Sequence, residues 1–365
     1  MKKNRKQLID LRKIDAGASI REALKRMDQI DKKLLLVFEG GHFRSLLSIG
    51  DVQRAIIANK PLDTKVMEVI RRNIRVASVE DDFESVRNTM ISFRTECMPV
   101  VDKKGELYDV IFWEDIVSGD EKRIIRKLNL PVVIMAGGAG TRLKPLTNVL
   151  PKPLIPIGEK TIMEHILDRF VDIGCRKIFA SLNFKAEFIR FYFDNLKNPD
   201  YNITYFTEEK PLGTAGSLFL LKGKIKSTFF VSNCDILIDQ DYGEIYDYHV
   251  EHKNELTIVA ALKHVKIPYG TVETTKGGQL TALHEKPEIT YKINSGLYIL
   301  EPALLNEIPR NEFFNITDLI EKILKRKGRV GVFPVTENSW TDIGEWSEYL
   351  KIANKELHAA PGKIG

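Results

Sequence analysis

Cysteine is scarce in this sequence, and long apolar runs are absent. The three cysteines, Cys97, Cys175 and Cys234, are scattered and form neither a disulfide framework nor a zinc pattern. No run of 18 apolar residues occurs, and the N-terminus lacks the apolar core of a signal peptide. The sequence therefore predicts a cytoplasmic protein with no membrane partner.

Neither sign of charge is in large excess. The formal net charge of +5 is modest for 365 residues, and the basic stretch at residues 2–6 is typical of a solvated tail. No basic stripe interleaved with aromatic residues follows it, so we expect no nucleic-acid partner. Hydrophobic residues at 43% and charged residues at 29% are typical of a soluble globular protein, and the length allows two or three domains.

The common phosphate-binding loops are missing as well. A Rossmann dinucleotide loop reads G-x-G-x-x-G, but here Gly138-x-Gly140 continues to Arg142 without a third glycine. The Walker pattern G-x-x-x-x-G-K-[ST] does not occur in this register. The seven histidines are scattered, and neither His165 nor His284 has a partner at metal-ligand spacing.

The chain does contain an apolar run that leads directly into a glycine-rich turn. Residues 132–136 predict a buried parallel strand, because a strand covered on both faces is apolar without alternation. The glycines of residues 137–142 let the backbone approach a ligand and turn its N–H groups toward anionic oxygens. Arg142 adds a fork of donors suited to phosphate, and Lys152 is held between two prolines. We expect a triphosphate site here, although such turns are also common as purely structural features.

The first 125 residues contain a repeat. Segments near 15–57 and 79–118 each predict a helix, an apolar strand, a glycine turn, a second strand and a closing helix. This duplication predicts an α+β module at residues 1–125, made from two half-units. The charged stretch before Pro131 predicts a linker to a second domain at residues 126–365.

Strands and helices alternate in that second domain. A helical pattern at residues 161–172 is followed by an apolar strand at 177–182 and a helix at 188–196. This order predicts an α/β fold with a Rossmann-like, mainly parallel mixed sheet. Ligands of such sheets bind beyond the carboxyl ends of the strands, where the remaining motifs fall.

Several strand ends in this domain carry candidate ligand-binding residues. Small residues at 208–216 let a planar base lie against the backbone, although they also suit a helix cap. Asp235 ends an apolar stretch, where a carboxylate is expensive to desolvate and makes sense as a ligand for Mg²⁺. Asp342 lies in a Trp-Thr-Asp-Ile-Gly segment, which taken alone is more often a turn. Loops between 268 and 298 suit a sugar phosphate, through Tyr269, Gly270, Glu285, Lys286 and Asn294.

Residues 137–153 closely resemble the signature of the sugar-1-phosphate nucleotidyltransferases, G-G-x-G-T-R-L-x-P-L-T followed by P-K-P. The order of six motifs up to residue 344 also matches that family. The resemblance implies that a nucleoside triphosphate and a sugar 1-phosphate react to give a nucleotide sugar and pyrophosphate. It assigns Arg142 to the leaving pyrophosphate and Lys152 to the charge around the α-phosphate. The remaining roles are Asp235 and Asp342 as ligands of Mg²⁺, or of Mn²⁺, and nucleotide contacts by Ala136, Gly137, Gly138, Gly140, Thr141, Glu209, Gly213, Thr214 and Ala215.

The resemblance also favours particular substrates. The Pro-Leu-Gly-Thr-Ala-Gly form of residues 211–216 looks like the mannose- and heptose-phosphate guanylyltransferase branch, so GTP is the expected donor, with UTP or dTTP as alternatives. Glucosamine, mannose and manno-heptose 1-phosphate all remain open as acceptors, for bacterial surface glycans or legionaminic acid-type precursors. Two other classes stay open: a non-catalytic nucleotide sensor with a transferase-like fold, and a Rossmann oxidoreductase.

Residues 8–120 resemble a tandem pair of CBS domains. Such modules commonly bind adenine nucleotides, with a Ser or Thr and an Asp three residues later holding the ribose; Ser48 and Asp51 match this pattern. In the second copy Phe112 replaces the hydroxyl and leaves Asp115. The resemblance implies regulation by an adenine nucleotide, and the alternative is a packing or dimerisation module. We expect a homo-oligomer.

Overall fold

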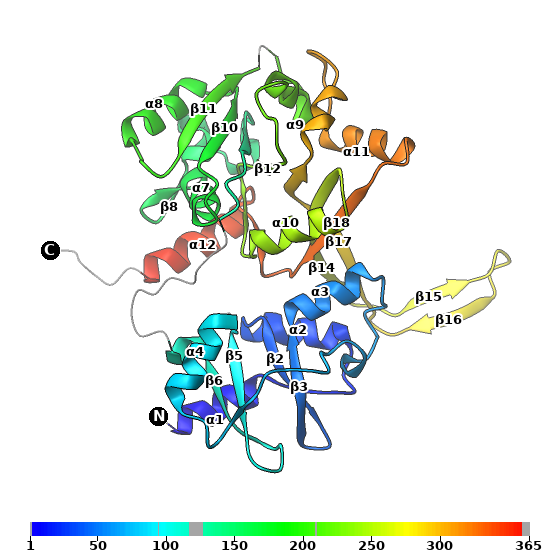
Figure 1. Ribbon diagram of the computed structural model, residues 1–365. Helices are drawn as coiled ribbons and strands as arrows, with labels where there is room; N and C mark the ends of the chain where they lie inside the picture. Colours follow the sequence, from blue (N-terminus) through cyan, green and yellow to red (C-terminus); the bar gives the residue numbers. More distant parts are fainter. Residues whose placement is uncertain (1, 94, 117–126, 209, 360–365) are drawn as a thin grey trace. The chain divides into compact units, whose positions relative to one another are not determined.

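The computed structural model describes residues 2–93, 95–116, 127–208 and 210–359. The chain divides into two compact units, Met1–Ile124 and Ile125–Gly365, coloured blue to cyan and green to red in Figure 1. Among the described residues, every helix is too short or too polar to cross a membrane.

The first unit is built from two half-units with the same strand arrangement. In each, two parallel strands are joined through a helix, and a third strand pairs antiparallel with the second. The first half-unit contains β1 (Lys13–Asp15), α2 (Ile20–Ile30), β2 (Leu34–Glu39), β3 (His42–Ser48) and α3 (Ile49–Ile57). The second contains β4 (Ala77–Ser78), α4 (Phe83–Phe93), β5 (Cys97–Val101), β6 (Leu107–Phe112) and α5 (Trp113–Ile116), and α1 (Lys2–Leu11) precedes both.

The two half-units share a core. Leu34 and Leu36 of β2 form one buried cluster with Cys97 of β5 and Val110 of β6. Each half-unit therefore covers apolar surface that the other would leave exposed, which is the physical reason for the duplication that the sequence indicates.

The second unit contains a seven-stranded sheet in the order β11-β10-β7-β12-β17-β14-β18. Its strands are β7 (Val132–Ala136), β10 (Lys177–Leu182), β11 (Asn202–Thr207), β12 (Phe229–Asn233), β14 (Leu256–Lys266), β17 (Glu288–Leu300) and β18 (Val330–Val335). The four strands β11, β10, β7 and β12 are parallel, and β17 runs antiparallel to its neighbours. The mainly parallel mixed sheet is therefore confirmed, and β7 coincides with the strand that the sequence predicts.

Helices and short turns connect these strands (Figure 1). They are η2 (Thr141–Leu143), α6 (Leu146–Val149), η3 (Lys152–Leu154), α7 (Ile162–Asp172), α8 (Ala186–Leu196), α9 (Gly213–Gly216), η4 (Ser217–Leu221), α10 (Tyr242–Glu251), η5 (Pro302–Asn306), α11 (Ile316–Lys325) and α12 (Trp346–Ala359). Thr161 caps α7 in a capping box with Glu164, which fixes where that helix begins. Leu218 of η4 and Leu319 of α11 pack with Val133 of β7 in the main buried cluster.

Three small two-stranded sheets complete the second unit. They are β8 (Pro156–Ile157) with β9 (Lys160–Thr161), β13 (Ile236–Ile238) with β19 (Trp340–Asp342), and β15 (Thr271–Thr274) with β16 (Leu280–His284). The β13–β19 pair matters most for the site, because it joins the segment after β12 to a segment about a hundred residues further along the chain.

Candidate active site

A cavity of about 620 Å³ lies at the carboxyl ends of the parallel strands. The loops that follow β7, β10, β11 and β12 all contribute to its wall. Because these strands are parallel, their ends meet at the same edge of the sheet, so motifs far apart in the sequence converge there.

The glycine turn after β7 owes its shape to a close approach between two segments. Gly140 has a φ of +61°, and a Cβ there would lie 2.8 Å from Thr147 Cγ2 and 3.0 Å from Lys152 Cβ. Thr147 Oγ1 donates a hydrogen bond of 3.0 Å to the Gly140 carbonyl. Gly140 therefore packs the turn against the segment that carries Lys152. Gly138, in contrast, lines the cavity and has open space where a Cβ would be.

Five charged side chains form one cluster at this turn. The Lys152 side chain is only 8% exposed, and its Nζ donates a hydrogen bond to Asp235 Oδ2. Arg142 lies 3.8 Å from Asp235 Oδ2 through Nη2 and 3.5 Å from Asp342 Oδ2 through Nη1. Arg142 Nη1 also donates a hydrogen bond of 2.6 Å to Glu345 Oε1, and this bond is the main reason why the pKa of Arg142 lies above its ordinary value.

The β13–β19 pair brings the two aspartates together. Ile236 lies opposite Asp342 in the register, and Ile343 donates a backbone hydrogen bond of 2.8 Å to the Asp235 carbonyl. No group of three or more His, Cys, Asp or Glu side chains suited to a metal occurs in the described part of the chain. Asp235, which lines the cavity, and Asp342, which lies in the same charged cluster, nevertheless match the few protein ligands that Mg²⁺ takes when phosphate oxygens supply the others.

The cavity also contains a cysteine. Burial raises the pKa of Cys234 to about 12, so its thiol stays protonated at neutral pH. A protonated, buried thiol is a poor nucleophile, which agrees with a reaction that needs no covalent intermediate on the protein.

The loop after β11 is the second wall of the cavity. Glu208 lines it and accepts two hydrogen bonds of 2.9 Å, from Ser181 Oγ and from the Leu212 backbone N–H. Gly213 has a φ of +78°, and a Cβ there would lie 2.8 Å from the Phe314 carbonyl oxygen. The loop therefore lies directly against the segment that precedes α11.

Most of the expected nucleotide contacts line this cavity: Gly137, Gly138, Gly140, Thr141, Gly213 and Thr214. Ala136 and Ala215 are buried and do not belong to the lining. Glu209 falls outside the described residues. Each of these contacts remains a prediction.

The expected sugar-phosphate residues are not among those that line the cavity. Tyr269 is 75% exposed, and Gly270 lies next to Glu285, whose Oε2 would be 3.1 Å from an added Cβ. Lys286 lies beside Glu285, at the base of the β15–β16 hairpin. Asn294, on β17, accepts a hydrogen bond of 3.1 Å from the Gly296 backbone N–H. The structure therefore places Gly270 next to Glu285, and the sugar-phosphate roles of all five residues remain predictions.

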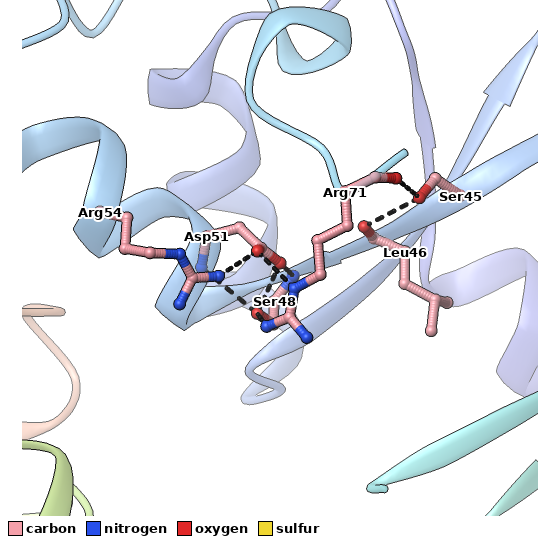
Figure 2. A network of polar contacts seen from close by, with 6 residues as sticks. All are labelled: Ser45, Leu46, Ser48, Asp51, Arg54 and Arg71. Carbon is pink, nitrogen blue, oxygen red and sulfur yellow. Dashed lines mark hydrogen bonds and ion pairs between the residues drawn. The ribbon is translucent and has the colours of Figure 1, made fainter. Parts of the chain in front are cut away.

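In the first unit, Ser48 and Asp51 bind each other (Figure 2). Ser48 caps α3, and its hydroxyl and backbone N–H donate to Asp51 Oδ2 at 2.6 and 2.9 Å. Arg54 and Arg71 donate to the other oxygen, Arg71 at 2.7 Å. Burial raises the pKa of Asp51, but hydrogen bonds from Ser48 and Arg71 outweigh it, and the net pKa is below the ordinary value. Asp115 makes the corresponding contact in the second half-unit, where Phe112 takes the place of the serine. It accepts a hydrogen bond of 2.9 Å from the Phe112 backbone N–H.

Several side chains at the cavity or its charged cluster were not expected from the sequence. They include Asn183, Phe184, Glu208, Phe313 and Glu345. Glu208 begins a recognised loop, and its place directly after β11 was the available signal. Phe313 and Glu345 reach the site only through tertiary contacts, so no local pattern marks them.

Comparison with known proteins agrees with this geometry. Residues 131–359 match the family of nucleotidyl transferases, and residues 66–121 match the CBS domain. The catalytic subunit beta of mannose-1-phosphate guanylyltransferase from Drosophila melanogaster is 30% identical over 250 residues, covering 64% of this chain and 67% of that protein. Mannose-1-phosphate guanyltransferase beta-A from Xenopus laevis is 31% identical over 256 residues, covering 65% of this chain and 70% of that protein.

A solved structure supports the fold. A Bacillus anthracis protein described as a glucose-1-phosphate thymidylyltransferase superposes with a TM-score of 0.50 at 20% identity, covering 64% of this chain and 98% of that one. The family match spans most of the chain and contains the whole charged cluster. The chain therefore belongs to the nucleotidyl transferase family, as its resemblance to the sugar-1-phosphate nucleotidyltransferases implies, and it carries a CBS domain ahead of its transferase domain.

Proposed function

We propose that the protein transfers a nucleotidyl group, preferably GMP from GTP, to a sugar 1-phosphate and releases pyrophosphate. The observation that carries this proposal is that Arg142, Lys152 and Asp235 line one cavity and that Asp342 joins their charged cluster through Arg142. Residues 126–365 are the catalytic domain in this proposal, and residues 1–125 are a regulatory tandem CBS module.

The reaction joins two anions. An oxygen of the sugar phosphate attacks the α-phosphorus and forms the new P–O bond, while the bond from that phosphorus to the bridging β-phosphate oxygen breaks and pyrophosphate leaves. Positioning and charge neutralisation carry such a step, without a protein nucleophile. Lys152, held rigidly by its burial, neutralises charge at the α-phosphate. Arg142, which is half exposed, contacts the pyrophosphate as it leaves.

Asp235 and Asp342 are the residues that would hold Mg²⁺, or Mn²⁺ in its place. When bound, the ion would neutralise phosphate charge and favour the in-line geometry. Lys152 forms an ion pair with Asp235, and Arg142 forms one with Asp342.

Glu208 supports the preference for GTP. The guanine edge carries adjacent N1–H and N2–H donors, and a carboxylate accepts from both. Each Glu208 oxygen already accepts one hydrogen bond, from Ser181 or Leu212, which leaves one lone pair on each for the base. Uracil and thymine offer a single N–H on this edge, so UTP and dTTP are the weaker alternatives.

The acceptor is a glucosamine, mannose or manno-heptose 1-phosphate, for bacterial surface-glycan or legionaminic acid-type precursors. Mannose is favoured by the names of the relatives and glucosamine by the CBS-fused arrangement. Pyrophosphate release from four nucleoside triphosphates, each with these three sugar phosphates, tests the function. No release with any pair would favour the alternative, a non-catalytic nucleotide sensor.

The CBS pair in this proposal senses an adenine nucleotide through Ser48, Asp51 and Asp115. Arg54 and Arg71, with half of each side chain exposed beside Asp51, supply positive charge for its phosphates. The rate of pyrophosphate release with and without AMP or ATP tests this role. If AMP and ATP neither bind the native chain nor change its rate, the alternative is that the CBS pair is a packing or dimerisation module. Light scattering would show whether the cytoplasmic enzyme is a homo-oligomer.

A further inference from the structure

Phe313 is an exposed aromatic side chain in the wall of the cavity. It is 65% exposed, whereas the next residue, Phe314, packs against the main buried cluster. Single exposed aromatic residues are common on protein surfaces, so exposure alone indicates nothing. Phe313 is distinguished by its position in a segment that is hydrogen-bonded to the loop after β11.

Five hydrogen bonds make that attachment, including one of 3.0 Å from the Ala215 N–H to the Phe314 carbonyl and one of 3.4 Å from the Thr214 N–H to Asn315 Oδ1. The Phe314 N–H donates to the Leu212 carbonyl at 2.9 Å, and the Gly216 N–H donates to the Phe314 carbonyl at 2.8 Å. On the C-terminal side, the Ile316 N–H donates to Thr214 Oγ1 at 2.9 Å. Cβ atoms at Gly213 and Gly216 would collide with this segment, at 2.8 and 2.7 Å from its backbone oxygens. The two segments therefore form one rigid wall that carries Phe313.

The order of the strands tells which part of a nucleotide reaches this wall. The charged cluster follows β7 and β12, whereas Glu208 and the glycine loop follow β11. Arg142 and Lys152 follow β7, which lies two strand spacings from β11, roughly 10 Å at about 4.8 Å each. A nucleotide whose phosphates lie at Arg142 and Lys152 therefore extends toward β11 and presents its base there.

We propose that Phe313 stacks on the face of the nucleobase whose edge Glu208 reads. The inference rests on the proposed function only in that the ligand is a nucleoside triphosphate. An aromatic ring offers every base a π-face, so Phe313 contributes affinity and Glu208 contributes selectivity.

The test measures binding of GTP and of inorganic tripolyphosphate, which has no base, to the full-length chain. Phe313→Ala is expected to weaken GTP binding on the order of tenfold and to leave tripolyphosphate binding unchanged. Phe313→Leu keeps apolar bulk but has no ring, and its affinity for GTP is expected to lie between those of the wild type and Phe313→Ala. Phe191→Ala is the matched control, because Phe191 is 73% exposed on α8 and does not belong to the cavity lining.

The kinetic readout separates stacking from a general disturbance. Stacking predicts a raised KM for GTP with kcat within about twofold, and an unchanged unfolding midpoint. Wild-type GTP affinity in Phe313→Ala, or an equal loss for GTP and tripolyphosphate, would overturn the inference. Wild-type protein that binds GTP but releases no pyrophosphate would refute the proposed transfer, and the binding comparison would still decide the role of Phe313.

Discussion

Gly344 lies where a single added methyl group would disturb the whole charged cluster. An ideal Cβ at this buried glycine would lie 2.6 Å from Asp342 Oδ1, 2.7 Å from Lys152 Nζ and 2.9 Å from Arg142 Nη2. Real Cβ atoms do not approach other atoms so closely, so Gly344→Ala must displace all three groups. The prediction is a protein that folds normally but reacts slowly.

Two effects on stability nearly cancel. The φ of Gly344 is outside the left-handed region, so alanine fits the backbone and stabilises the chain by about 0.4–1 kcal/mol through the unfolded state. Against this, Asp342 Oδ1 accepts a hydrogen bond of 2.7 Å from the Gly344 N–H, and its displacement costs about 1 kcal/mol. The free energy of unfolding should therefore stay within about 1 kcal/mol of the wild-type value.

The effect on the rate should be far larger. Loss of one preorganised charge contact typically costs on the order of 10²-fold in rate, and Gly344→Ala moves three groups. Pyrophosphate release with the best substrate pair gives the rate, and denaturant unfolding gives the stability. Gly277→Ala is the control, because its Cβ would meet only Thr275 Oγ1 at 3.9 Å. Wild-type turnover in Gly344→Ala would refute the idea that these side chains act as a unit.

Other substitutions test single parts of the site and the fold. Lys152→Ala and Asp235→Asn should give folded proteins that release pyrophosphate on the order of 10²-fold more slowly, and near-normal turnover would remove that residue from the mechanism. Gly138→Ala, whose methyl enters the cavity, should weaken GTP binding without loss of stability, whereas Gly140→Ala should destabilise the protein by roughly 1–3 kcal/mol in denaturant unfolding. Burial lowers the pKa of His249 below 6.5, so its neutral form stabilises the fold above that pH, and stability should fall as the pH drops through 6.5. Denaturant unfolding of wild type and His249→Gln over that range checks this, and equal pH slopes would contradict it.

The local sequence pattern was enough to predict the strand and the glycine turn that form one side of the site. The apolar run of β7 is buried as expected, and the glycine turn after it lines the cavity. Convergence of the later motifs also follows from local information, because alternating strands and helices imply parallel strands whose carboxyl ends share one edge. The sequence thus predicts the central sheet and a cavity at the carboxyl ends of its parallel strands.

Tertiary pairing determines the remainder of the site. Asp342 reaches Arg142 because β19 pairs with β13, and no spacing in the sequence specifies that register. Glu345 follows from the same pairing, as the residue that holds the guanidinium. The residues around the β15–β16 hairpin could not be placed from the sequence. The order of the motifs does not specify whether a long antiparallel strand brings them to the cavity.

Four glycines explain why the fold and the site depend on each other. Gly140 packs against the lysine segment, Gly213 against the segment before α11, Gly296 against the end of β12, and Gly344 against the charged cluster. At Gly213, Gly296 and Gly344, a Cβ would come within 3 Å of atoms from a distant part of the sequence, and at Gly140 it would come within 3 Å of Thr147 in the next turn of the chain. These glycines therefore join the segments that build the cavity, in addition to any contact with phosphate. A glycine-rich pattern in this chain indicates both functions at once, and only the contacts of each position separate a ligand-facing glycine such as Gly138 from one that holds the walls together.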